Sequence, residues 1–378
     1  ISLGLLKEPV IFRSHGGRPA AIESGKVHID IAFIAAPAAD NMGNANGRLG
    51  ASACGSMGYA IPDSRFADKV VVITDNLMPY PLYPASIKES DVDFVVNVDK
   101  IGEASGIVSG TTKITRDPVS LKIAEYAAKV IQFSGLLKDG FSFQTGAGGA
   151  SLAVTKYLKP IMLKNSIHGS FGLGGITSYL VDMLKSGCFE ALQDVQCFDL
   201  GAVESIKENP NHIEISATDY ASPAAKSCAA SSLDAVVLGA TQIDTNFNVN
   251  VHTDSSGFIT GGSGGHSDTA EESKLSIIVA PLFRARLPII VDKAITVSTP
   301  GKNVDVLVTQ RGIAVNPLRQ DIYENIKKSG LPIFDIHDLK ALAEKYTGVP
   351  DDYRPNGRCI AKVEHRDGQI IDEIKQAE

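Results

Sequence analysis

The sequence predicts an α/β protein made of two related domains in tandem, each built on a mainly parallel sheet. Two observations lead to this fold class: a phrase that occurs twice, and short apolar runs separated by amphipathic stretches. The runs are rich in β-branched residues and apolar on both faces, which is typical of central parallel strands covered by helices. They span residues 29–35, 70–74, 93–98, 235–240, 275–280 and 305–309.

The repeated phrase reads DIAFIAAPAADNMGNAN from Asp30 and DAVVLGATQIDTNFNVN from Asp234. In both copies a buried-strand pattern runs into a loop rich in Asp and Asn. A repeat this long is not a solenoid unit. It indicates that one domain was duplicated, so we expect a ligand in the cleft between the two halves.

The segments between the strands have the pattern of helices. Residues 120–133 and 176–184 are amphipathic. Asp117 and Asn316 each precede a proline suited to a first helical turn, so both are candidate N-caps. Near the C-terminus, residues 359–374 alternate around a central Asp-Gly pair, which predicts a closing β-hairpin.

We place the boundary between the domains where a predicted helix ends and a new strand begins, which gives domains 1–137 and 138–378. No Ser/Pro-rich linker separates them, so we expect the halves to be closely packed. The second copy extends much further back from Asp234 than the chain extends back from Asp30. We therefore expect the first domain to lack its N-terminal part.

The composition is that of an ordinary globular protein, with 44% hydrophobic and 21% charged residues. The net charge of −7 argues against nucleic acid or an anionic membrane as a partner. The five cysteines are odd in number and form no C-x-x-C pair, which favours reduced thiols in the cytoplasm. No His or Cys residues have metal-ligand spacing, so no metal site is predicted.

A Gly-rich loop at residues 141–154 is the first candidate ligand site. A short strand enters a Gly-x-Gly-Gly turn, and a helix follows. Glycines let the backbone approach a ligand, and helix N-terminal amides favour an anion or an oxyanion. The alternative is a simple packing turn. The candidate binding residues here are Gln144, Thr145, Gly146, Gly148 and Gly149.

A second Gly-rich segment, residues 169–183, also enters a predicted helix and is more typical of a structural turn. The third, residues 257–274, contains GGSGG followed by His266. This much glycine exceeds the need of an ordinary turn and offers consecutive backbone amides to an anion. Its candidates are Ser263, Gly264, Gly265 and His266, although a histidine here could simply bond a loop carbonyl.

The first half offers fewer candidates. Arg18, in the run SHGGR, could pair with a substrate carboxylate in bidentate fashion. Asn44 and Asn46 recur in the second copy as Asn248 and Asn250 and follow buried strands. These asparagines are candidate substrate contacts, but Asn also stabilises turns through its own backbone.

Several runs together resemble the α subunits of citrate lyase: GNANG, QTGAGGASLAVTKYL, LGGIT, NPNHIEIS, IDTNFNVNV, GGSGGHSDTA, SIIVAP and RGIAVNP. The resemblance covers nearly the whole chain. It implies two tandem CoA-transferase-type domains, in agreement with the repeat.

The resemblance also implies a reaction. In this family citrate displaces acetate from an acetyl thioester on an acyl-carrier (γ) subunit, and a β subunit then cleaves the citryl thioester. The thioester is borne on a dephospho-CoA-type arm, with acetyl-CoA as a surrogate, and no cofactor is bound permanently. The expected partners are citrate, the carrier and the β subunit, in a homo-oligomer or a hetero-oligomeric complex.

The resemblance assigns roles to the glycine loops. Gly264, Gly265 and His266 would form the oxyanion hole, and Gln144 with the loop that follows it would hold citrate or the thioester. Gln242 occupies a catalytic position where related covalent CoA-transferases have Glu, and an amide cannot serve as an anionic nucleophile. Two alternatives remain: a CoA-transferase for another carboxylate, and a diverged citrate-binding subunit without activity.

Overall fold

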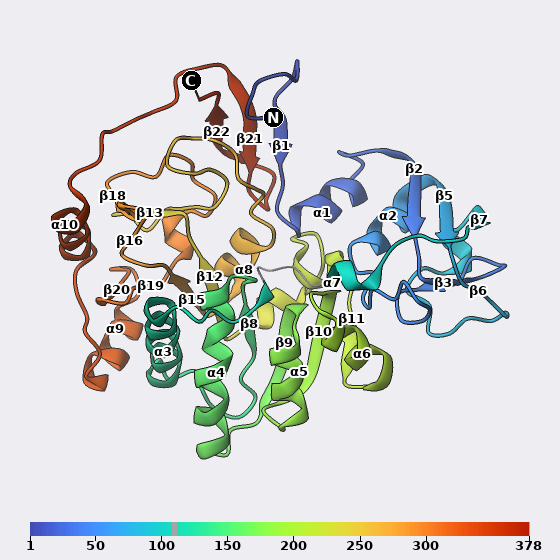
Figure 1. Cartoon of the computed structure of the whole chain (residues 1–378), viewed down its shortest axis with the longest axis horizontal. Helices are drawn as coiled ribbons and strands as arrows, with labels where there is room; N and C mark the ends of the chain where they lie inside the picture. Colours follow the sequence, from blue (N-terminus) through green and yellow to red (C-terminus); the bar gives the residue numbers. More distant parts are fainter. Residues whose placement is uncertain (108–111, 378) are drawn as a thin grey trace.

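The computed structural model describes residues 1–107 and 112–377 and contains a larger and a smaller α/β body side by side (Figure 1). The larger body holds an eight-stranded sheet in the order β11-β10-β9-β8-β12-β15-β19-β20. Neighbouring strands are parallel except β19 and β20. The strands are β8 (Phe143–Thr145), β9 (Gly169–Ile176), β10 (Phe189–Cys197), β11 (His212–Glu214), β12 (Ala235–Gly239), β15 (Leu275–Val279), β19 (Val306–Val308) and β20 (Ile313–Val315).

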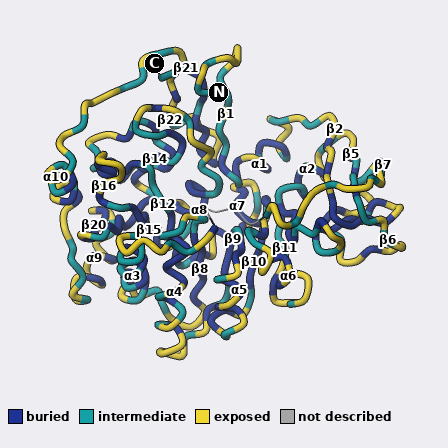
Figure 2. Tube along the Cα trace, viewed as in Figure 1, coloured by how far each residue is buried: buried dark blue, intermediate teal, exposed yellow. Residues whose placement is uncertain are grey.

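Helices cover both faces of this sheet, because its central strands are apolar on both sides. In β12, Ala235 and Val237 belong to one core cluster, while Val236 and Leu238 belong to another. The buried core follows the sheet in Figure 2. One face packs on α3 (Pro118–Phe133), α4 (Gly149–Lys164), α5 (Ser178–Lys185), α6 (Leu200–Glu208) and α9 (Gln320–Ile326), and the other on α7 (Ala217–Ala221), α8 (His266–Glu272) and α10 (Ile336–Thr347).

The predicted strands and the helix at residues 120–133 are confirmed, and so is one of the two predicted caps. The Asp117 side chain accepts a hydrogen bond from the Ser120 amide, with proline in the first turn of α3. The prediction for Asn316 is wrong, because α9 begins only at Gln320. The Asn316 side-chain nitrogen instead donates to the carbonyls of Gly301 and Val304.

The smaller body is built on a three-stranded parallel sheet with the order β2-β5-β7. One face forms a core with α2 through Ala32, Ile34, Val70 and Val72. The opposite face is apolar but open: Phe33 is 68% exposed. Its elements are β2 (Ile29–Ala35), β5 (Ala67–Thr74), β7 (Phe94–Asn97), α1 (Gly17–Glu23) and α2 (Ala60–Phe66).

A third sheet joins the two ends of the chain. β1 (Val10–Phe12) pairs in parallel with β21 (Cys359–Glu364), which forms a hairpin with β22 (Ile370–Lys375). The predicted C-terminal hairpin is therefore confirmed, and the termini lie close together in Figure 1. The start of the chain is thereby attached to its end.

The repeated phrase adopts the same local structure in both halves. In each copy a short strand pairs antiparallel with the next strand and parallel with a third strand. The Asp40 carboxylate accepts from the Asn44 amide and side chain, as the Asp244 carboxylate does from Asn248. The strands are β3 (Ala38–Asp40), β4 (Ala45–Asn46) and β6 (Leu77–Met78), and β13 (Gln242–Asp244), β14 (Val249–Asn250) and β18 (Ile290–Val291).

The packing does not follow the predicted division at residue 137. Helix α3 lies before that point, yet its apolar stripe packs on α4 and on the large sheet, where Ile123 and Ile131 are fully buried. The second Gly-rich segment is also not a loop, since residues 169–176 form β9. Within residues 1–107 and 112–377, no helix is long and apolar enough to cross a membrane.

Candidate active site

A crevice forms at the carboxyl ends of β8 and β12, where the strand order reverses. The chain leaves β8 toward β9 on one side and returns to β12 on the other side. Ligands of open α/β sheets bind at such a switch point. A cavity of about 490 Å³ lies here, lined by Gly148, Gly149, Ser151, Gly239 and Arg284, with others.

The N-terminus of α4 faces this cavity. Gly148 is its N-cap and no side chain caps the helix. The first amides of an α-helix lack partners within the helix and carry partial positive charge, so they attract an anion. Arg284, on the exposed strand β16 (Phe283–Arg284), adds a full positive charge at the rim. The helix amides and Arg284 therefore favour a carboxylate ligand, and Asp117, which also lines the cavity with its side chain bound to Ser120, opposes them in part.

Gln144 and Thr145 end β8 beside this region. The Gln144 side-chain nitrogen donates to the Tyr220 hydroxyl at 2.9 Å. The Gln144 Oε1 and Thr145 Oγ1 atoms are buried without a partner among the described residues. Leaving such atoms unpaired costs about 1–3 kcal/mol each. Both oxygens are therefore unsatisfied, although they are enclosed and neither residue lines the cavity.

The loop between β1 and α1 reaches across to the third glycine loop. The His15 amide donates to the Gly264 carbonyl at 3.0 Å. Buried Asp268 accepts from the Ser14 hydroxyl at 2.7 Å and from the Gly16 amide at 2.9 Å. Burial raises the pKa of Asp268 to about 6, opposed by these two donors and by Arg366. Asp268 therefore fixes this loop to α8.

His266, expected as a donor in the oxyanion hole, is enclosed in the structure. Its ring is fully enclosed, with Nε2 2.9 Å from the Gly239 carbonyl and Nδ1 2.8 Å from the Thr299 hydroxyl. Its backbone amide donates to the Ser263 carbonyl. Burial lowers the ring's pKa to about 4. Since every donor of His266 is engaged, the residue supports the loop and does not offer a free donor to an oxyanion.

Gly264 lies beside the ring of His15 and Gly265 beside Tyr220, and each position favours glycine. Gly264 has φ +59°, in the left-handed region. A side chain carbon on Gly265 would lie 2.5 Å from the Tyr220 hydroxyl. These glycines therefore allow the loop to approach both Tyr220 and the ring of His15.

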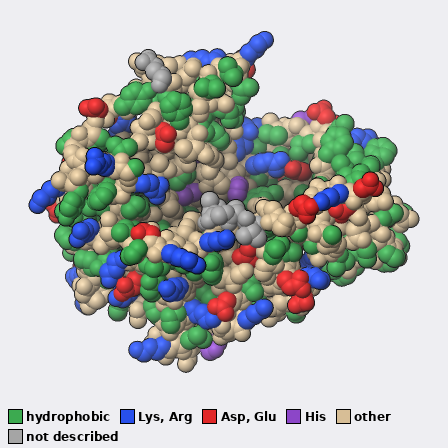
Figure 3. All heavy atoms as spheres, viewed as in Figure 1, with side chains coloured by type: hydrophobic (Ala, Val, Ile, Leu, Met, Phe, Trp, Pro, Cys, Tyr) green, Lys and Arg blue, Asp and Glu red, His purple; other side chains and the backbone are tan. Residues whose placement is uncertain are grey.

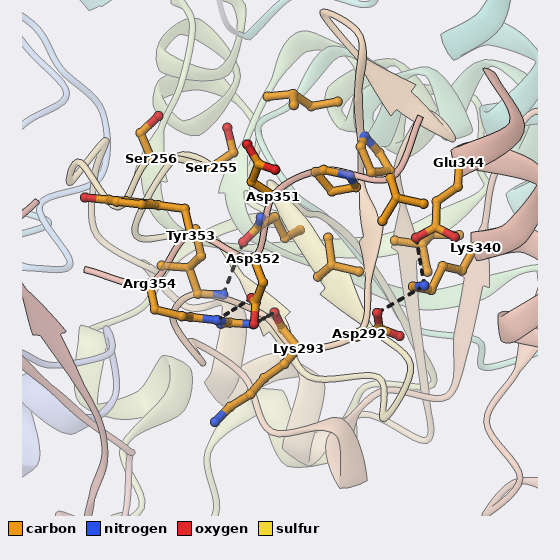
Figure 4. Close-up of a pocket in the computed structure, with 18 residues that line it drawn as sticks. Ser255, Ser256, Asp292, Lys293, Lys340, Glu344, Asp351, Asp352, Tyr353 and Arg354 are labelled. Atoms are coloured by element: carbon orange, nitrogen blue, oxygen red, sulfur yellow. Dashed lines mark hydrogen bonds and ion pairs between the residues drawn. The ribbon is translucent and has the colours of Figure 1, made fainter. Parts of the chain in front are cut away.

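Gln242 lies in a different groove, of about 890 Å³, between β13 and residues 349–354 (Figure 4). Its Oε1 atom accepts from the Asn250 side chain at 3.2 Å. The guanidinium of Arg354 is occupied by Asp352 and two carbonyls, and Lys340 by Asp292 and Glu344, as the dashed lines indicate. Two of the three cationic residues that line the groove are thus paired, while Lys293 forms no ion pair among the described residues.

The candidates of the first half are not brought to the crevice. Arg18 forms a bidentate pair with Asp63, at 2.8 and 3.0 Å. The Asn44 side chain binds Asp40, and that of Asn46 donates to the Pro84 carbonyl. All three bond within the smaller body: the Arg18 pair joins α1 to α2, and the two asparagines stabilise loops.

Four residues at the site were missed: His15, Tyr59, Tyr220 and Arg284. His15 stands in the run SHGGR, from which only Arg18 was predicted as a site residue. No local pattern marks the other three, because they reach the site from separate elements. In Figure 3 histidine side chains line the hollowed centre of this face, between the two bodies.

A buried cluster of possible metal ligands lies elsewhere, on β10 and β11. The Asp194 Oδ2 atom accepts from the Cys197 thiol at 2.9 Å and from the His212 ring at 3.0 Å. The other ring nitrogen of His212 is 2.9 Å from the Ser205 hydroxyl. These hydrogen bonds explain why the three side chains lie together.

The buried histidines predict acid sensitivity. Burial lowers the pKa values of His15, His252 and His266 to about 4. The unfolded chain, with values near 6.5, binds more protons between pH 4 and 6.5, so stability falls as pH drops through this window. The raised pKa of Asp268 has the opposite sign and offsets part of the loss.

We expect the free energy of unfolding to fall between pH 7 and pH 5, by about 2 kcal/mol for each enclosed histidine. Urea unfolding at the two pH values measures this. His252→Gln removes one titrating ring and should flatten the dependence. Equal stability at both pH values would contradict the buried neutral state of these rings.

The fold is shared with a solved structure of low sequence identity. The 4-hydroxybutyrate CoA-transferase of Porphyromonas gingivalis has the same fold, with a TM-score of 0.56 and 18% identity, over 88% of this chain and 78% of that one. The crevice thus lies in a CoA-transferase-type fold.

The family follows from closer relatives. The protein-family model "Citrate lyase, alpha subunit (CitF)" matches residues 1–377. The citrate lyase alpha chain of Klebsiella pneumoniae is 50% identical over 376 residues, which is 100% of this chain and 74% of the relative. A Streptococcus mutans structure described as the putative alpha subunit of citrate lyase in complex with citrate has a TM-score of 0.97 and 49% identity, over 100% of this chain and 74% of that one. The chain belongs to the family of citrate lyase α subunits.

Proposed function

We propose that this chain is an acyl-carrier transferase that exchanges acetate for citrate on a thioester, as the α subunit of a citrate lyase. The observation that supports it most is the uncapped N-terminus of α4, which faces the switch-point cavity beside Arg284. A cavity, an uncapped helix N-terminus and a rim arginine coincide here, whereas the N-terminus of α3 at the cavity beside Arg311 is capped by Asp117.

The proposed chemistry needs no protein nucleophile. A citrate carboxylate attacks the acetyl thioester carbon, the new C–O bond forms, and the C–S bond breaks to release a thiolate. The thiolate then attacks the citryl carbonyl of the mixed anhydride and expels acetate. Holding both acyl partners together supplies much of the rate. A Gln at position 242 is compatible with this route, because no glutamyl thioester is required.

The cavity supports an arrangement for citrate. One carboxylate would bind the first amides of α4 and Arg284, which provide local positive charge in a protein of net charge −7. The unpartnered oxygens of Gln144 and Thr145 could then receive an ordered water. Gly146, Gly148 and Gly149 would let the ligand approach the backbone.

The proposal extends to partners and location. The acetyl thioester would be presented by an acyl-carrier subunit on a dephospho-CoA-type arm, with acetyl-CoA as surrogate and no resident cofactor. A β subunit would consume the citryl thioester. We place the assembly, homo- or hetero-oligomeric, in the cytoplasm, which accords with the five free thiols.

Arg284→Ala should raise KM for citrate about 5- to 10-fold, with a smaller change in kcat, because the lost ion pair is exposed and worth about 1 kcal/mol. Arg286→Ala is the matched control, since Arg286 is on the same exposed turn but does not line the cavity. Steady-state kinetics at varied citrate measures both. An equal rise in both variants would place citrate elsewhere.

The exchange assay tests the function itself. The protein is incubated with acetyl-CoA or acetylated carrier and with citrate, and released acetate and citryl thioester are quantified. Citrate-dependent release of both products supports the transferase. Release with another carboxylate but not with citrate would favour a different CoA-transferase. Citrate binding without exchange would favour a diverged binding subunit.

A further inference from the structure

The ring of His15 lies next to the third glycine loop and is less enclosed than the rings of His252 and His266. It belongs to the loop between β1 and α1, which Asp268 fixes to α8 through Ser14 and Gly16. Its ring lies against Gly264: a side chain carbon on that glycine would be 3.4 Å from Cε1 and 3.5 Å from Nε2. The ring therefore stands at the glycine loop that contains Gly264 and Gly265.

Tyr59 determines which nitrogen of this ring has the proton. The Tyr59 hydroxyl lies 2.5 Å from His15 Nδ1, and it has no other acceptor among residues 1–107 and 112–377. Burial raises the pKa of Tyr59, so the phenol keeps its proton. Burial, with Arg18, lowers the pKa of His15 to about 4, so the imidazole is neutral at pH 7.

We assign the tautomer from these observations, since Tyr59 has no other acceptor among the described residues to which its proton could point. A protonated phenol donates to Nδ1, so the single ring proton resides on Nε2. The Nε2 atom has no hydrogen-bond partner among the described residues. The ring therefore presents one N–H donor beside Gly264. His266, whose two ring nitrogens are both engaged, cannot do this.

We propose that His15 donates its Nε2–H to the oxygen that becomes negatively charged when a carboxylate attacks the thioester carbon, and that Tyr59 is the positioning residue that holds the ring in this tautomer. The inference rests on the proposed transferase function. When the C–O bond forms, the carbonyl π electrons move to the oxygen. When the C–S bond breaks, they return. His15 keeps its proton throughout, so no proton balance is required.

A neutral imidazole suits this role. It can stabilise developing negative charge as a hydrogen-bond donor, and it costs no deprotonation at neutral pH. Being fixed before the reaction, it avoids reorganisation at the moment the charge forms. Removing one such donor typically lowers kcat by about 10²- to 10³-fold.

The test compares His15→Ala, His15→Gln and Tyr59→Phe in the exchange assay. We expect kcat to fall about 100-fold in His15→Ala with KM for citrate within about twofold, since the lost contact forms only in the transition state. His15→Gln, whose amide can still donate, should recover part of the rate. Tyr59→Phe should lose about tenfold. His168→Gln, on an exposed loop, is the control.

The outcomes separate the two proposals. A wild-type protein without exchange would refute the transferase function. If the wild type is active and His15→Ala has the same kcat, the role of His15 alone is overturned. The same holds if His15→Ala raises KM by the same factor by which it lowers kcat. Nitrogen-15 NMR of the His15 ring gives a readout independent of activity: the proton must lie on Nε2, and a proton on Nδ1 would also overturn the inference.

Discussion

Asp268→Ala is expected to destabilise the protein by about 3–5 kcal/mol. Asp268 is fully buried, and its two oxygens accept from the Ser14 hydroxyl and the Gly16 amide. Its removal leaves both donors buried without a partner, at about 1–3 kcal/mol each, and takes a carboxylate from beside the buried Arg366 guanidinium.

Urea unfolding measures this effect. Asp63→Ala is the matched control, because the exposed Asp63–Arg18 pair should contribute less than about 1 kcal/mol. Asp268→Asn, which retains one acceptor, should lie between the two. An Asp268→Ala variant as stable as Asp63→Ala would show that the loop between β1 and α1 is not anchored by this carboxylate.

Gly16→Ala is expected to lower kcat/KM by about 100-fold or more. A side chain carbon at Gly16 would lie 1.9 Å from the backbone carbonyl oxygen of Ala221, so the loop cannot dock in its present position. The displacement would move His15 away from Gly264, and a shift of about 1 Å can cost about 10²-fold in rate.

The exchange assay and a thermal melt together measure this effect. Gly102→Ala is the control, because nothing lies within 4 Å of the added carbon there. The melt separates lost stability from lost positioning, as overpacking itself costs about 1–3 kcal/mol. A Gly16→Ala variant with wild-type kcat/KM would contradict the placement of this loop at the active site.

The strands and the hairpin could be predicted because their patterns are local. Each apolar run in the sequence is a strand, and those of the large sheet are apolar throughout because both faces are buried. The expected cover on both faces is wrong for β2, β5 and β7, since one face of their sheet is exposed. The packing of α3 was not predictable in the same way. Its apolar stripe indicates that one face is buried, but it does not indicate which sheet covers that face.

The site residues, too, could be predicted only where their pattern is local. The glycine loop at residues 146–149 is visible in the sequence and lines the crevice through Gly148 and Gly149, while Gly265 lies against Tyr220, the partner of Gln144. The roles of His266 and Arg18 could not be predicted, because the partners that occupy them, Gly239 and Asp63, lie far away in the chain. Distant hydrogen bonds decide which polar groups stay free for a ligand.

One measurement tests the central claim most directly: a first-turnover reaction with citrate labelled with oxygen-18 in its carboxylates. If a citrate carboxylate attacks the acetyl thioester, the bridging oxygen of the anhydride comes from citrate and leaves with acetate. We therefore expect one oxygen-18 atom in each acetate released. Acetate whose new oxygen comes from solvent would show hydrolysis in place of transfer and would contradict the proposed function.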